Sequence, residues 1–241
     1  MAIKPILFNT EMVRAILDGR KSCTRRLVKP QPDEKHTYPL GFVTDSTEKK
    51  EVGCFGFGIG EYGGSIQYAK PQYHTDDVLY IRETWTEECG KYYYRADYDS
   101  DYLDPCETLS GGYPASCRNY AGCDGCTATS TRIHWRLSIH MPKEAARIWL
   151  QVTDVRVERL QDIAPKDAEN EGVGNLFYED IGYSGKDYGT EVDPEYGIAK
   201  EQFAWLWDST IKKADLDCYG WDANPYVFVI QFVKFDRPEE I

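Results

Sequence analysis

The sequence has no long hydrophobic run, and this absence excludes several classes of protein. No apolar stretch in its 241 residues approaches the roughly 20 residues that a membrane-spanning helix needs. The N-terminal region also lacks the apolar segment behind a basic start that marks a signal peptide. Hydrophobic residues nevertheless make up 41% of the chain, which is too many for wholesale disorder. We therefore expect a soluble, cytoplasmic protein with a buried core and no membrane partner.

Positive charge is also scarce, because 28 basic residues face 40 acidic ones and the net charge is −12. This balance argues against binding to double-stranded DNA. The acidic excess is concentrated in two stretches, 86–131 and 174–198, and the rest of the chain is close to neutral. A local basic site for a phosphate-bearing ligand is therefore compatible with the overall acidity.

Cysteine is not scarce, but its eight copies do not suggest disulfides in a chain without an export signal. Cys123 and Cys126 have the Cys-x-x-Cys spacing of a zinc knuckle, with Cys117 nearby and Cys106 as a possible fourth ligand. Cys89 competes for that fourth position, and free thiols in a cytosolic loop are the alternative. The sequence thus raises the possibility of a structural zinc ion in the stretch 86–131.

The hydrophobic pattern predicts an α+β protein without internal repeats. Residues 86–131 and 174–198, rich in Gly, Tyr and Asp, read as two loop-rich insertions in one domain that spans 1–241, and residues 33–75 as mostly loop and short hairpin. The last strand, 226–235, is apolar on both faces, which is typical of a closed barrel covered by helices. Further strands are expected at 4–8, 24–28, 76–85 and 148–160, and helices after Thr10, at 166–171 and around 203–211.

The stretch between Arg14 and Lys29 concentrates positive charge beside possible nucleophiles, with six basic residues and one acid. Gly19 should end a short amphipathic helix there, and a strand should follow, so the basic residues are expected on an exposed helix-to-strand turn. Lys21, three residues before Thr24, could hold an anionic ligand and assist an attack on it. The alternative is a solvated basic loop.

The basic turn resembles the ASCH domains of the PUA-like superfamily, in the large form carried by phages and prophages. Gly19, Lys21 and Arg26 match the family signature Gly-x-Lys-x-x-Glu-x-Arg, whereas Thr24 stands where glutamate is usual. Further matches follow in the same order, at 78–85, 135–147, 152–172, 203–209 and 224–232. The resemblance implies a small mixed β-barrel flanked by helices, with a cleft suited to RNA or a nucleotide, in a bacterial or phage-infected cell.

With threonine at position 24, the basic turn resembles that of the small bacterial ASCH enzymes that hydrolyse N4-acetylcytidine to cytidine and acetate. Those enzymes carry lysine and threonine at these two positions, and a glutamate in an Ala-Glu-x-Glu segment that corresponds to Ala168-Glu169-Asn170-Glu171. The resemblance implies that Thr24 is the nucleophile, Lys21 the base and Glu171 a proton shuttle, with no cofactor required. Backbone N–H groups of the turn are expected to bind the oxyanion. The greater length and the two insertions are departures that leave the substrate open.

Four further residues are candidates for binding the substrate or RNA. Arg20, Arg25 and Arg26 could bind phosphate, although one of them could instead pair with an acid across the barrel. Trp85 could stack on a base, although a tryptophan at this position is more often part of the core. The sequence therefore favours an amidohydrolase that acts on an acylated nucleoside, with a non-catalytic RNA-binding or nucleotide-binding module as the alternative.

Overall fold

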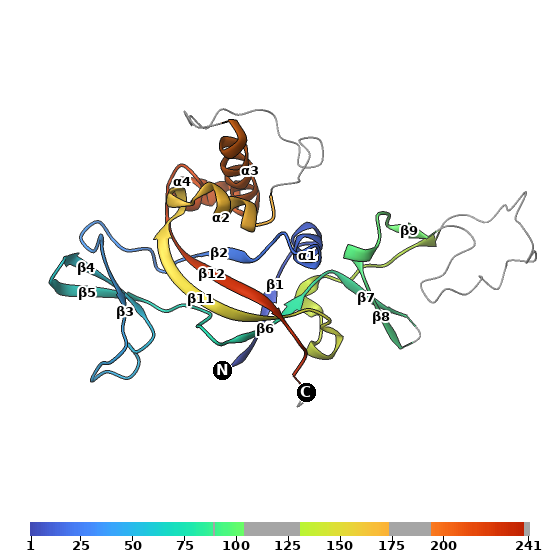
Figure 1. Cartoon of the computed structure of the whole chain (residues 1–241), viewed down its shortest axis with the longest axis horizontal. Coiled ribbons are helices and arrows are strands. Elements are labelled where there is room, and N and C mark those ends of the chain that lie inside the picture. Colours follow the sequence, from blue (N-terminus) through green and yellow to red (C-terminus); the bar gives the residue numbers. More distant parts are fainter. Residues whose placement is uncertain (89, 104–130, 174–193, 239–241) are drawn as a thin grey trace, which may run out of the picture. The chain divides into compact units, whose positions relative to one another are not determined.

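The computed structural model describes residues 1–88, 90–103, 131–173 and 194–238 (Figure 1). These residues form an α+β fold, as the sequence predicts. They divide into two compact units. The first unit consists of residues 1–4, 15–78 and 150–235, and the second of residues 5–14, 79–149 and 236–241, within the described ranges.

Strands dominate both units. The strands are β1 (Ile3–Leu7), β2 (Cys23–Leu27), β3 (Tyr38–Phe42), β4 (Phe55–Gly60), β5 (Gly63–Ala69), β6 (Val78–Arg82), β7 (Trp85–Glu88), β8 (Lys91–Tyr94), β9 (Tyr102–Leu103), β10 (Thr131–Arg132), β11 (Trp149–Arg159) and β12 (Tyr226–Phe235). The α-helices are α1 (Thr10–Leu17), α2 (Pro165–Asn170), α3 (Pro194–Thr210) and α4 (Leu216–Tyr219). The largest sheet has the order β1-β6-β11-β12-β2, and a smaller one has the order β3-β4-β5.

The five-stranded sheet is open at β1 and β2 in the described residues, so the expected closed barrel is not found there. β12 is buried on both faces as predicted, but two different layers cover it. Val227 and Val229 pack into the core beneath the helices, whereas the ring of Tyr226 lies 4.9 Å from that of Phe57 in β4. The barrel prediction was wrong because an apolar strand needs cover on both faces, and helices and a second sheet provide it without closure.

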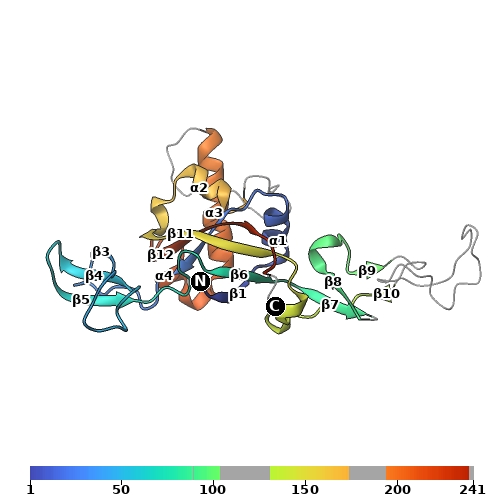
Figure 2. The same cartoon turned by 60° about the horizontal axis from the view of Figure 1, so that its bottom comes forward.

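α2 and α3 lie on the same side of β11 and β12 in both views (Figures 1 and 2). Their apolar side chains form one buried cluster with those of β12 and of the neighbouring connecting segments, made of Leu160, Ile163, Ala168, Val173, Ala199, Phe203, Ala204, Trp207, Trp221, Val227 and Val229. Burial of each large apolar side chain stabilises the fold by about 1.5–3 kcal/mol. The cluster holds the end of α2, where Glu171 follows, against the sheet. No described helix has the length and apolar character needed to cross a membrane.

The three-stranded sheet β3-β4-β5 occupies part of the stretch 33–75, which was expected to be mostly loop and short hairpin (Figure 2). β4 and β5 form such a hairpin, and β3 extends it to a sheet. Glycine at every second position of Phe55-Gly56-Phe57-Gly58-Ile59-Gly60 hides the strand in the sequence, because glycine is typical of turns. Phe55 and Phe57 are buried, and a Cβ at Gly56 would lie only 3.3 Å from Ile66 of β5. Glycine is therefore used here for close packing of one strand on its neighbour.

The second unit contains the hairpin of β7 and β8, within a stretch that was expected to be loop. Arg147 holds this unit together, since its guanidinium donates to both oxygens of Glu83 at 2.9 Å and contacts Asp97 at 2.7 Å. The ring of Tyr94 lies 4.0 Å beneath the same guanidinium.

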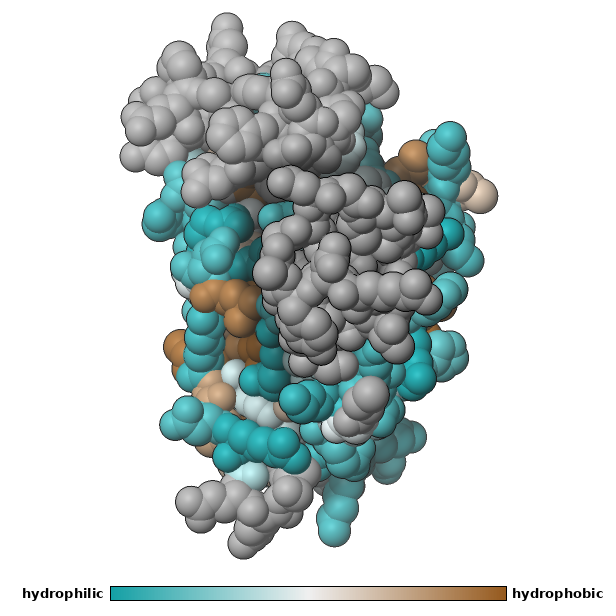
Figure 3. Space-filling view, turned by 90° about the vertical axis from the view of Figure 1, so that its right-hand side faces the viewer, coloured by the Kyte–Doolittle hydropathy of each residue, from teal (hydrophilic) through white to brown (hydrophobic). Residues whose placement is uncertain are grey.

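On the face shown in Figure 3, hydrophobic side chains reach the surface only in small groups between hydrophilic ones, which is ordinary for a protein surface.

Candidate active site

The side chains of β2 point alternately to the two faces of the sheet, because successive side chains of a strand lie on opposite faces. Its register with β12 pairs Arg25 with Val229, and Arg26 with Phe228. Val229 belongs to the core beneath the helices, so Arg25 faces the helices. Arg26 and Thr24 share the other face. The two neighbouring arginines therefore have different surroundings and different roles.

Lys21 and Glu171 form a buried pair, as needed if they act together. Lys21 Nζ lies 2.5 Å from Glu171 Oε2 and donates to the carbonyl oxygen of Glu171 at 2.8 Å. Lys21 is 4% exposed and Glu171 3% exposed. The backbone supports this contact, because the two residues form a short antiparallel bridge and the N–H of Ser22 donates to the carbonyl of Asn170 at 2.9 Å.

Burial lowers the pKa of Lys21 below the usual lysine value of 10.5, because the charged ammonium loses its hydration. The nearby carboxylate of Glu171 acts in the opposite direction, and the charge of Arg26 adds to the lowering. Burial is the largest of these effects. A depressed pKa of Lys21 was expected from the neighbouring arginines and from burial, and burial is the main cause.

Arg25 neutralises the acids around the pair. Its guanidinium lies 3.1 Å from Glu171 Oε1, 2.7 Å from Glu158 Oε1 and 3.6 Å from Asp167 Oδ2, and its side chain is 0% exposed. Arg25 also lies over the ring of Phe203, 5.6 Å from its centre. Arg25 therefore fits the alternative interpretation, in which one arginine pairs with an acid, and it orients Glu171. Its expected role in binding substrate or RNA stays a prediction.

Thr24 and Arg26 lie together on the other face of β2. Nη1 of Arg26 donates to Thr24 Oγ1 at 2.6 Å and to the carbonyl of Arg25 at 2.9 Å. Thr24 is only 2% exposed. A guanidinium at this distance favours a negative charge that develops on or near the threonine oxygen. Burial lowers the pKa of Arg26, while the charges of Glu171 and Tyr73 oppose that change.

The backbone N–H groups of the turn are already used. Those of Gly19, Arg20 and Lys21 donate to carbonyls of α1, and that of Ser22 donates to Asn170. These four groups therefore cannot serve as the expected oxyanion donors without breaking the turn. The cationic side chain of Arg26 is the better-placed donor, because it already contacts Thr24.

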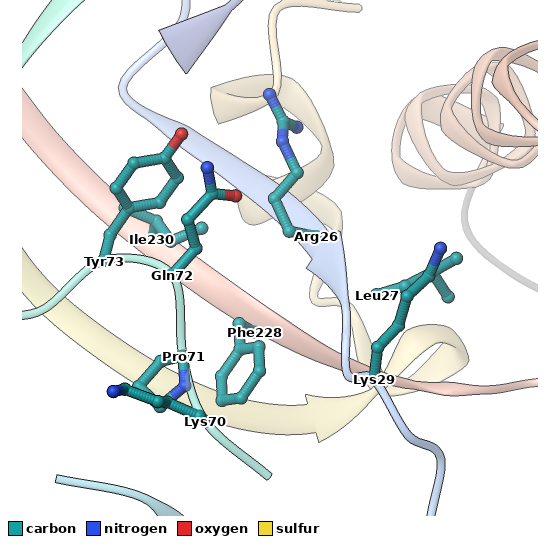
Figure 4. A pocket seen from close by; sticks show the side chains of 9 residues that line it. All are labelled: Arg26, Leu27, Lys29, Lys70, Pro71, Gln72, Tyr73, Phe228 and Ile230. Carbon is teal, nitrogen blue, oxygen red and sulfur yellow. The ribbon is translucent and has the colours of Figure 1, made fainter. Parts of the chain in front are cut away.

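A pocket of about 190 Å³ opens on the face of Arg26 (Figure 4). This volume is several times the roughly 30 Å³ share of one water molecule, so the pocket can take a small ligand or part of a larger one. Its apolar wall includes Phe228 and Ile230 of β12. The lining residues are Arg26, Leu27, Lys29, Lys70, Pro71, Gln72, Tyr73, Phe228 and Ile230.

Other predicted site residues have different surroundings. Arg20 is paired with Asp18 at 3.0 Å and donates to the carbonyl of Gly172 at 3.0 Å. Trp85 belongs to the second unit, where it is 3% exposed and its ring lies 4.9 Å from the guanidinium of Arg136. A role for Trp85 in stacking on a base stays a prediction.

The four proposed zinc ligands, Cys106, Cys117, Cys123 and Cys126, lie outside the described residues, and the zinc site stays a prediction. Within the described ranges, no group of three or more His, Cys, Asp and Glu side chains is arranged to hold a metal ion. The described cysteines, Cys23, Cys54 and Cys218, are free thiols. Burial raises the pKa of Cys23 to about 12, so this thiol beside the site is a poor nucleophile at neutral pH.

The site also contains three residues that were not predicted from the sequence, Glu158, Asp167 and Tyr73. Glu158 could have been found, because Asp154, Arg156 and Glu158 alternate along the long strand and therefore indicate one charged face. Asp167 and Tyr73 gave no comparable signal, since only the folded chain brings them to β2. Tyr73 lines the pocket, and burial raises its pKa above the usual value for tyrosine.

Gly172 fixes the distance between the end of α2 and Lys21, and its replacement by alanine should destabilise the protein by about 1–3 kcal/mol. Its φ of +94° disfavours other residues, and a Cβ there would lie 2.8 Å from the Cβ of Ala15 and 3.3 Å from that of Lys21. Denaturant unfolding measures the change. Gly60→Ala is the control, because a Cβ at Gly60 meets no atom within 4 Å. Equal stability of the two variants would contradict the prediction.

Comparison of the chain with protein-family models, with curated proteins and with solved structures found no match. The resemblance to ASCH domains, based on Gly19, Lys21 and Arg26, therefore stays a prediction. Any assignment of function depends on the buried Lys21–Glu171 pair, the Thr24–Arg26 contact and the pocket beside them.

Proposed function

We propose that this protein is an amidohydrolase that removes the acyl group from an acylated nucleoside such as N4-acetylcytidine. In this proposal Thr24 is the nucleophile, Lys21 the base and Glu171 the proton shuttle, in a phage-type or prophage-type ASCH protein with a modified PUA-like fold. The observation that carries the proposal is the buried contact of 2.5 Å between Lys21 Nζ and Glu171 Oε2. A lysine that serves as a base needs such desolvation and a partner that can take its proton.

The short contact between Lys21 and Glu171 allows one proton to belong to either group. When Lys21 has lost its own proton to solvent, its amine can accept one from a hydroxyl and pass it to the carboxylate of Glu171. Glu171 can then donate that proton to a leaving amine. Arg25 lies 3.1 Å from the other oxygen of Glu171 and fixes the orientation of the carboxyl group through this transfer.

The proposed reaction has two stages. In the first, Thr24 Oγ1 forms a bond to the acetyl carbon while its hydroxyl proton passes to Lys21 through a bridging water, because the described contact of Oγ1 is with Arg26 and that of Lys21 Nζ is with Glu171. Arg26, which lies 2.6 Å from Oγ1, stabilises the oxyanion. The bond from the acetyl carbon to the amine nitrogen then breaks, Glu171 protonates that nitrogen with the proton it received from Lys21, and cytidine leaves. In the second stage, water attacks the threonine ester, one of its protons returns to Thr24 Oγ1 as the ester bond breaks, and acetate leaves while the other proton passes to solvent, so the site regains its starting protonation.

The rate of hydrolysis should rise with pH as Lys21 loses its proton. The expected midpoint of kcat/KM lies below the ordinary lysine value of 10.5, because burial lowers the pKa of Lys21. The measurement is the pH dependence of cytidine release, corrected at each pH for hydrolysis without protein. A rate that falls as pH rises through this range would contradict the assignment of Lys21 as the base.

Purified protein incubated with N4-acetylcytidine should release cytidine and acetate, and Thr24→Val should abolish this turnover. Valine keeps the shape of threonine but lacks the nucleophilic oxygen. Thr153→Val is the matched control, because Thr153 is exposed on β11 and should keep full activity. Turnover by Thr24→Val at the wild-type rate would contradict the proposal. If the wild-type protein released no cytidine, the RNA-binding or nucleotide-binding alternative would be favoured.

A further inference from the structure

The pocket beside Arg26 has an unusual charge for this protein. Three of its lining residues, Arg26, Lys29 and Lys70, are cationic and none is acidic, although the chain has 40 acidic residues against 28 basic ones. A concave surface of one charge sign concentrates ligands of the opposite sign. The pocket therefore favours an anion within a molecule that is otherwise acidic.

The polar and apolar groups of the pocket are separated in space. In Figure 4 the guanidinium of Arg26 extends back toward the start of β2, and the hydroxyl of Tyr73 lies at the same end. Lys29 and Lys70 leave the chain near the other end, on either side of Phe228, and their ammonium groups are directed to opposite sides of the view. Phe228 is 5% exposed, whereas both lysines are exposed. The pocket thus has an aromatic wall between an inner cation and two outer ones.

The aromatic wall followed by the outer cations matches the base followed by the phosphate in a nucleotide. An aromatic base fits against an apolar wall such as Phe228, and a phosphate bound to the sugar reaches the exposed end. The ammonium of Lys29 lies 5.7 Å from the centre of the Tyr219 ring, and a weak contact of this kind leaves the side chain able to move to a ligand. The inner cation, Arg26, then lies at the acyl end beside Thr24.

We propose that Lys29 and Lys70 form a phosphate subsite, so that this pocket binds a cytidine nucleotide in preference to the free nucleoside. The inference rests on the proposed function for the orientation of the acyl end toward Thr24. The subsite itself depends only on the pocket and its charge. It gives a role to Lys29 of the basic stretch and adds Lys70, which the sequence did not suggest.

The test compares the binding of cytidine, cytidine 5′-monophosphate and cytidine 3′-monophosphate by calorimetry with the wild-type protein. We expect at least one monophosphate to bind about tenfold more tightly than cytidine, a difference that should shrink as salt increases. Lys29→Gln/Lys70→Gln should remove the preference by weakening the binding of the monophosphates. Lys49→Gln/Lys50→Gln is the matched control, because these exposed lysines do not line the pocket.

Binding of a cytidine trinucleotide, measured in the same way, distinguishes a free nucleotide from RNA as the ligand. If the trinucleotide binds more tightly than either monophosphate, the subsite is assigned to RNA. Equal affinity for cytidine and both monophosphates, or no binding of a monophosphate at millimolar concentration, would overturn the inference. Its failure is separable from that of the proposed function. Phosphate preference without hydrolysis of N4-acetylcytidine contradicts only the enzyme, and hydrolysis without phosphate preference contradicts only the subsite.

Discussion

Replacing Lys21 by methionine should reduce the hydrolysis of N4-acetylcytidine by about 10²–10⁴-fold, the usual contribution of a positioned general base. Methionine fills a similar space but cannot accept a proton. The variant should also lose stability, because it leaves the buried carboxylate of Glu171 with Arg25 as its remaining close ion pair. A low rate in Lys21→Met could therefore reflect misfolding, and a second variant is needed to separate the two effects.

The double variant Lys21→Met/Glu171→Gln makes that separation. It removes both charges of the pair, so its free energy of unfolding should exceed that of Lys21→Met while its activity stays as low. Denaturant unfolding and cytidine release measure the two quantities. Lys4→Met is the control, because the Lys4–Asp77 pair at 2.7 Å is partly exposed and far along the sequence from the turn. Full activity in Lys21→Met, or recovered activity in the double variant, would contradict the assigned base.

Replacing Arg25 by methionine should lower the free energy of unfolding by about 3–5 kcal/mol, the cost of breaking a buried pair from one side. The Arg25 side chain is 0% exposed and compensates three carboxylates, those of Glu158, Asp167 and Glu171. Without it, these carboxylates lose their shared cation in a site from which water is largely excluded. The measurement is chemical denaturation followed by fluorescence of the tryptophans.

Arg156→Met is the matched control for Arg25→Met. Arg156 contacts two of the same carboxylates, Asp167 at 2.6 Å and Glu158 at 3.3 Å, but its side chain is 33% exposed. Water can replace an exposed guanidinium, so the expected loss of stability is below about 1 kcal/mol. Equal losses of stability in the two variants would show that burial does not decide the cost of removing the arginine, and would contradict the role given to Arg25.

The sequence predicted those parts of the fold that depend on local pattern. The strand 226–235 matches β12, and the helix expected at 166–171, closed by Gly172, matches α2 to within one residue at each end. The helix after Thr10 was also predicted. Its N-terminus is capped by Asn9, whose Oδ1 accepts from the N–H of Met12. Local pattern suffices in these cases because amphipathic spacing and terminating glycines act over a few residues.

The stretch 33–75, expected to be mostly loop and short hairpin, was predicted less well. β4 and β5 form a hairpin there, but β3 pairs with β4 to make a third strand, and glycine serves close packing. Strand pairing is set by the partner strand as much as by the strand itself, so composition is a weak guide there.

By itself, the sequence determined that a helix ends at Gly19 and a strand follows, and that the basic residues and Thr24 gather where the two meet. Only the tertiary structure decided what each of those residues contacts. Pairing of β2 with β12 directs Arg25 to the buried acids and Arg26 to the pocket, and the end of α2 brings Glu171 to Lys21. The physical reason is that charge becomes functional through burial and distance, and both arise only when segments far apart in the chain pack together.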